Sequence, residues 1–173
     1  MSVRAWSYRY VGPVELKAAV RPGSGGYRIS SAAEFDDWIA GRSAVELAEP
    51  FTFVIGTDGV LRLAPRRSEH VACAGGDMVL SAGEIGFVRE ADRWAVSEVS
   101  NQSTGYCPDI GFWSEVARAL DDVGLGRPSA FTQEVVFRRC LGCQERNIVR
   151  EDDFVCVLCG RDLPETWNVD PTV

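Results

Sequence analysis

Four cysteines near the C-terminal end constrain the fold of this chain more than any other feature. They form two Cys-x-x-Cys pairs, Cys140 with Cys143 and Cys156 with Cys159, and 12 residues separate the two pairs. A two-residue gap lets two thiolates from one tight turn reach the same tetrahedral ion, and two such turns complete a four-sulfur shell. The spacing therefore predicts one structural zinc ion, with no open coordination position for catalysis.

Residues 136–163 resemble a zinc ribbon, in which the segment "QERNIVREDDFV" would form a hairpin that brings the two cysteine pairs together. The alternative, two disulfides, requires an oxidising compartment. The opening "MSVRAWSYRY" has no apolar signal segment, so we expect a cytoplasmic location and bound metal. The ribbon carries five arginines and five acidic residues. Nucleic-acid binding needs a positive face, so we expect folding support or protein contact instead.

Outside the ribbon, the pattern is rich in strands. Asp58-Gly59 between two apolar runs predicts a hairpin, and two further strands are expected at 84–89 and 94–99. Helical spacing of apolar residues predicts helices within 30–41 and 109–124. Residues 3–20 are predicted to form strands, with a break at Gly12-Pro13.

These elements predict an α+β fold, with an antiparallel sheet and two helices in residues 1–130, followed by the ribbon and a tail in 131–173. The chain is 46% hydrophobic and 25% charged, as is usual for globular proteins. No apolar run approaches the roughly 20 residues of a membrane helix, so no membrane partner is expected.

A second group of reactive residues contains His70, Cys73 and Cys107. One interpretation is a second zinc site, which we do not favour. Another is a thiol nucleophile activated by His70, and Cys107, which precedes an expected helix start, has the more suitable electrostatic position. The third is structural: a hydrogen-bonded histidine and two buried cysteines.

The stretch "SNQSTGYCP", residues 100–108, joins the last expected strand to the second helix. Ser103, Thr104 and Gly105 are a candidate anion-binding loop, because backbone N–H groups before a helix and two hydroxyls suit phosphate or carboxylate. Cys73 and the arginines of "LRLAPRRSEH", Arg67 among them, are candidate ligand contacts. The competing interpretation is a turn whose polar side chains bond their own backbone.

The order of segments from Phe53 to Gly124 resembles a module of bacterial polymorphic-toxin and conflict-associated proteins. In that module a histidine-containing turn and an "AGE" strand precede an Asn-x-Ser-Gly-His-Tyr-x-Pro element. The matching residues here are His70, Ala82-Gly83-Glu84, Asn101, Ser103, Tyr106 and Pro108. Gly105 stands where the module has its second histidine, so this chain has only one of the module's two imidazoles. The whole chain also resembles bacterial zinc-ribbon proteins of unassigned activity.

Together these features predict a zinc-binding interaction protein in a bacterial conflict or defence setting. It would recognise a protein or a small anionic ligand through the loop end that carries His70 and residues 103–107. The net charge of -7 argues against general nucleic-acid binding. The alternative is an enzyme, a hydrolase or transferase acting on a nucleotide or ADP-ribose-like substrate. Its candidate catalytic residues are His70, Glu84, Tyr106 and Cys107.

Overall fold

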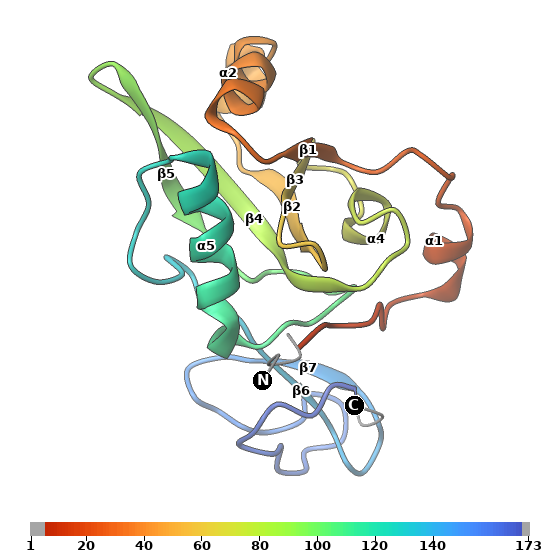
Figure 1. Cartoon of the computed structure of the whole chain (residues 1–173). Helices are drawn as coiled ribbons and strands as arrows, with labels where there is room; N and C mark the ends of the chain where they lie inside the picture. Colours follow the sequence, from red (N-terminus) through yellow and green to blue (C-terminus); the bar gives the residue numbers. More distant parts are fainter. Residues whose placement is uncertain (1–5, 171–173) are drawn as a thin grey trace, which may run out of the picture.

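A computed structural model, which describes residues 6–170, shows one five-stranded antiparallel sheet beside a small C-terminal lobe (Figure 1). The strand order is β1-β3-β2-β4-β5. The strands are β1 (Tyr27–Ile29), β2 (Phe51–Gly56), β3 (Leu61–Ala64), β4 (Val79–Glu90) and β5 (Arg93–Val99). The fold is therefore α+β with an antiparallel sheet, as the sequence predicts.

The two longer helices are α2 (Ala32–Ala40) and α5 (Trp113–Val123). The hydroxyl of Ser31 caps α2 by accepting the Glu34 N–H at 3.2 Å. A short 3-10 turn, η1 (Ile110–Phe112), leads into α5. Gly124 ends α5 in the left-handed conformation, at a φ of 80°. Both helices lie within the ranges expected from the sequence.

Three shorter helices are α1 (Val14–Ala18), α3 (Ala44–Leu47) and α4 (His70–Cys73). The expected strand at residues 14–18 is wrong: Pro13 fixes its own backbone at the start of α1, and α1 buries none of its residues. Before it, Tyr8 pairs with Val79 in an isolated bridge, and residues 3–5 lie outside the described range. No helix within residues 6–170 has the length and apolarity to cross a membrane.

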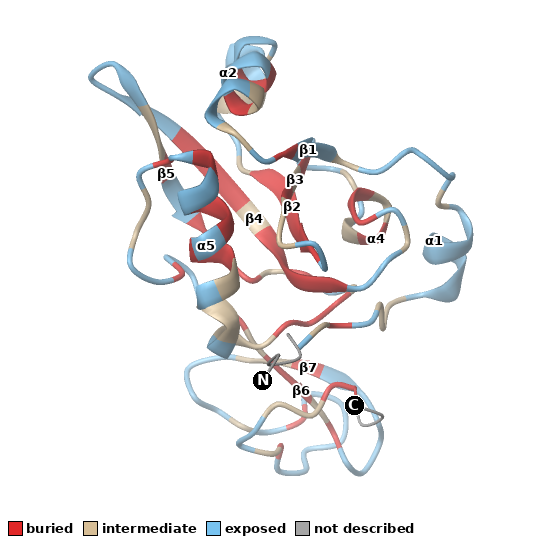
Figure 2. Ribbon diagram, viewed as in Figure 1, coloured by how far each residue is buried: buried red, intermediate tan, exposed pale blue. Residues whose placement is uncertain are grey.

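The two faces of the sheet pack on different helices, because side chains alternate along each strand. From β2, Phe53 faces the larger core under α2 and α5, which includes Trp38 and Leu120. Val54 faces a smaller core that includes Val71 of α4 and Tyr106. Figure 2 shows the resulting buried band along β2, β4 and α5. Tyr106, from the loop 100–108, therefore packs on the α4 side of the sheet.

The C-terminal lobe is built on a hairpin of β6 (Val136–Arg139) and β7 (Arg146–Val149). The tail that follows returns to the start of the chain. The Trp167 ring lies edge-on to the Tyr8 ring at 5.3 Å. The guanidinium of Arg9 donates two hydrogen bonds to Asp170, at 2.9 and 3.0 Å. The domain boundary between residues 130 and 131 stays a prediction, and these contacts cross it.

Candidate functional site

The sulfur atoms of Cys140, Cys143, Cys156 and Cys159 lie within 4.8 Å of one another. The Sγ atoms of Cys140 and Cys159 are 3.5 Å apart, and those of Cys143 and Cys156 are 3.6 Å apart. Four sulfurs at a Zn–S distance of about 2.3 Å stand roughly 3.8 Å apart in a tetrahedron, whereas disulfide sulfurs are about 2 Å apart. The four cysteines therefore form a metal-binding cluster.

The two cysteine turns have the same backbone hydrogen-bond pattern. In each turn, the carbonyl of the first cysteine accepts the N–H four residues on, and its N–H donates to the carbonyl five residues on. In the first turn Cys140 bonds Gln144 and Glu145, and in the second turn Cys156 bonds Gly160 and Arg161. The N···O distances are 2.8–2.9 Å. The residues four positions on, Gln144 and Gly160, adopt φ values of 67° and 77°. Because the two turns share this geometry, the thiols of both cysteine pairs point toward one common position.

The hairpin differs from the expected one. The sequence predicts that it lies within residues 144–155, but β7 pairs with β6, and the first cysteine turn connects these two strands. The second turn follows a tight reversal at 150–153, where Arg150 and Asp153 form an isolated bridge. The first cysteine pair is therefore fixed by the hairpin, and the second is brought to it from the other side.

Backbone N–H groups prepare two of the thiols for a cation. The N–H of Cys143 lowers the pKa of Cys140, and the N–H of Cys159 lowers the pKa of Cys156. Thiolates bind metal and thiols do not, so these hydrogen bonds favour the binding form. Four thiolate ligands suit zinc, and they leave no coordination position for a substrate.

Asn147 positions the second turn, a role that the sequence pattern does not predict. Its side chain is 2% exposed. Its Nδ2 donates to the Cys156 Sγ at 3.4 Å, and its Oδ1 accepts the Val157 N–H at 2.9 Å. Partners of this kind orient metal ligands. An asparagine in a strand gives no signal of that role until the pairing of β6 with β7 is known.

His70 and Cys73 lie on the same short helix, α4. The Nε2 of His70 is 2.8 Å from the Gly83 carbonyl oxygen, and burial lowers the pKa of this imidazole. The Cys73 thiol contacts the Arg62 carbonyl at 3.6 Å, and burial raises its pKa to about 12. At neutral pH the Cys73 thiol is therefore protonated, a form that is a poor nucleophile.

The loop 100–108 turns inward. Ser103, Tyr106 and Cys107 are each at most 2% exposed. The Ser103 hydroxyl accepts the Tyr106 N–H at 3.3 Å, and the Tyr106 hydroxyl donates to the Asp77 carbonyl at 2.7 Å. Burial raises the pKa of Cys107 to about 11, against a lowering effect of Arg146. These groups have partners within the protein.

Asn101 anchors the same loop to the C-terminal lobe, and its side chain is fully buried. Its Nδ2 donates to the carbonyls of Pro108 and Val135, at 3.0 and 2.7 Å. Its Oδ1 accepts the Val135 N–H at 2.7 Å. The Trp167 indole also donates to the Cys107 carbonyl at 2.7 Å. The loop is therefore a joint between the sheet and the lobe.

The structure separates some of the candidate site residues. Cys73 and Tyr106 share the core under α4, whereas Cys107 packs in another cluster with Val135 and Phe137. Among the described residues, the four-cysteine cluster is the one group of three or more potential metal ligands. His70, Cys73 and Cys107 are not part of such a group.

The remaining candidates lie at or near the surface. Arg67 and Thr104 are exposed. Glu84, on β4, lines a cavity of about 400 Å³ together with Glu98 and Thr132. A side chain at Gly105 would begin 2.8 Å from the Tyr10 ring. The histidine that the similar bacterial module has at this position would therefore require the Tyr10 ring to move.

His70 should make folding stability depend on pH, and it is the only histidine of the chain. Its folded-state pKa is lowered, so as pH falls through about 6.5 the unfolded state takes up the proton first. The contribution of His70 to stability should therefore be complete above that pH and decline as pH falls from about 6.5 to 5. His70→Gln should reduce this decline in thermal melts. An equal decline in both proteins would contradict the assignment.

Comparison with models of protein families, with curated proteins and with solved structures found no match to this chain.

Proposed function

We propose that the four-cysteine cluster holds one structural zinc ion, and that the protein acts by binding a protein partner. The distances among the four thiol sulfurs support the zinc ion. Metal analysis of the purified protein should give one zinc per chain. Two zinc ions per chain would require a further site, and the absence of zinc would contradict the proposal.

Apolar side chains on the two cysteine turns carry the proposal of partner binding. Leu141 lies in the first turn, and Val157 and Leu158 lie in the second, with exposed fractions of 72%, 83% and 68%. The cysteine cluster holds the two turns together, and we call these three exposed side chains the turn surface. Groups of exposed apolar side chains commonly mark interaction sites.

The partner that suits this surface is a protein segment with apolar side chains flanked by basic ones. The chain has a net charge of -7, and a zinc ion with four thiolates adds a negative centre beneath the turn surface. Complementary charge speeds association and excludes acidic competitors. The resemblance to conflict-associated proteins supports a partner from a toxin or defence system.

The sequence pattern predicts recognition at the loop end with His70 and residues 103–107. Burial of Ser103, Tyr106 and Cys107 gives this site less support, because a partner would have to open the loop to reach them. A nucleotide enzyme has less support too. His70 and Tyr106 bond backbone carbonyls, and the cavity beside Glu84 has a second carboxylate, Glu98, which would repel phosphate.

The test is photo-crosslinking from position 158 in cells, followed by reconstitution with the purified partner. Val157→Asp should reduce partner binding at least tenfold and retain one zinc per chain. Val45→Asp is the matched control, because Val45 is 79% exposed on α3, away from the cysteine turns. Equal binding by both variants and the wild type would exclude the turn surface.

A further inference from the structure

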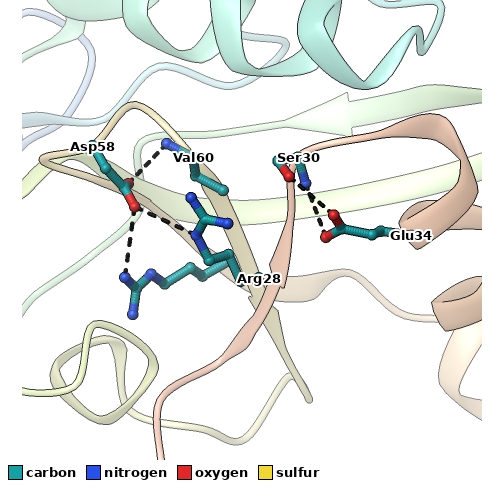
Figure 3. A network of polar contacts seen from close by, with 6 residues as sticks. Arg28, Ser30, Glu34, Asp58 and Val60 are labelled. Atoms are coloured by element: carbon teal, nitrogen blue, oxygen red, sulfur yellow. Dashed lines mark hydrogen bonds and ion pairs between the residues drawn. The ribbon is translucent and has the colours of Figure 1, made fainter.

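Two arginines stand directly opposite each other at one edge of the sheet. The register of β1 and β3 pairs Arg28 with Arg62. Like charges opposite each other in an antiparallel pair are destabilising unless an anion lies between them. Figure 3 shows the anion present, the carboxylate of Asp58 from the β2–β3 turn. The same figure shows Glu34 bonding Ser30 further along the chain.

Asp58 satisfies this pair incompletely. One of its oxygens accepts the Val60 N–H at 3.0 Å. The other lies 3.5 Å from the Arg28 Nε and 3.9 Å from the Arg62 Nη2, too far for strong hydrogen bonds. Among the described residues, neither guanidinium donates a side-chain hydrogen bond, and the Arg62 Nε is buried without a partner. One carboxylate is thus shared by two guanidinium groups, and both groups have N–H donors without an acceptor in the described part of the chain.

A glycine-rich loop lies against the same arginine. A Cβ on Gly25 would stand 3.5 Å from the Arg62 Nη1 and 3.4 Å from the Cys73 carbonyl oxygen. The N–H of Gly26 donates to that carbonyl at 2.9 Å, which fixes the loop. The N–H of Gly25 donates to no described residue. Backbone N–H groups of glycine loops beside cations are typical phosphate contacts.

We propose that Arg28, Arg62 and the loop 22–26 bind the phosphate group of a small ligand. Phosphate offers several oxygens to two planar guanidinium groups, whereas Asp58 offers one free oxygen to both. Asp58 occupies the position of a ligand oxygen and competes with the ligand. The site shares no residue with the cysteine cluster or the turn surface, so it does not depend on the function proposed above.

The test is NMR titration of the full-length, zinc-loaded protein with inorganic phosphate at constant ionic strength. Amide signals of Gly25, Arg28 and Arg62 should shift together. Arg62→Gln should weaken phosphate binding at least tenfold. Arg118→Gln, an exposed arginine on α5 that pairs with Glu115, is the control and should bind phosphate as the wild type does. Equal weakening by both variants would show non-specific attraction and overturn the proposal.

Asp58→Asn gives an independent result that does not rely on losing a cation. Asparagine can still accept the Val60 N–H, and removal of the competing charge should tighten phosphate binding about tenfold. A purely structural ion pair predicts lower stability and no gain in phosphate affinity, which would overturn the proposal.

Phosphoserine binding as tightly as phosphate, or more so, would indicate a phosphate monoester, and much weaker binding would indicate free phosphate. Succinate binding as tightly as phosphate would exclude phosphate selectivity.

Discussion

Cys143→Ser is expected to abolish zinc binding and unfold residues 136–163. Apparent zinc-binding free energies of small four-ligand sites are on the order of 10 kcal/mol, and this energy is also folding energy. The part of the lobe around the cysteines has little else to replace it, because the buried cluster there consists of Cys140, Cys156 and Leu163, with two partly buried neighbours. Zinc content and amide hydrogen exchange of the lobe would measure the effect.

Cys73→Ser is the matched control, since Cys73 is buried outside the cluster. It should retain one zinc per chain and a lobe whose amides are protected from hydrogen exchange, even where the substitution destabilises the core under α4. If Cys143→Ser kept one zinc per chain and an unchanged melting curve, the four-cysteine site would be wrong. A chelator should reproduce the Cys143→Ser exchange pattern in the wild type.

Asn101→Ala is expected to lower the free energy of unfolding by on the order of 3–5 kcal/mol. The change removes three hydrogen bonds and leaves the Val135 N–H and the carbonyls of Pro108 and Val135 without their side-chain partner. Each buried group left unpaired costs about 1–3 kcal/mol. Urea denaturation followed by fluorescence would measure the loss.

Thr104→Ala in the same loop is the control, because Thr104 is exposed. It should change stability by no more than about 0.5 kcal/mol. Equal, small effects of both substitutions would mean that the loop contributes little to the joint with the lobe. The interpretation as a ligand loop would then regain support.

Local signals in the sequence predict much of this fold. Ser31 and Gly41 bound α2, Asp58-Gly59 turns between β2 and β3, and the cysteine spacing predicts the cluster. The helix ends and the turn depend on neighbours within a few residues, and the cluster depends on the two-residue spacing within each cysteine pair. The helix α1 was missed because Val14 and Leu16 resemble strand residues, although both are exposed in a short helix after Pro13.

The loop 100–108 could not be placed from sequence because its partners are distant. Asn101 meets Val135, 34 residues away, and Cys107 meets Trp167, 60 residues away. Both residues have side chains that suit a ligand site equally well. The burial that distinguishes a joint from a binding loop comes from these long-range contacts.

The return of the tail to the start of the chain has a consequence for synthesis. Tyr8 and Arg9 leave the ribosome more than 150 residues before Trp167 and Asp170, which pack against them. Domains fold largely in the order in which they are made. Here the sheet can form first, while the surface around Tyr8 stays uncovered until the lobe has been translated. The final packing of the first described residues is therefore a late step of folding.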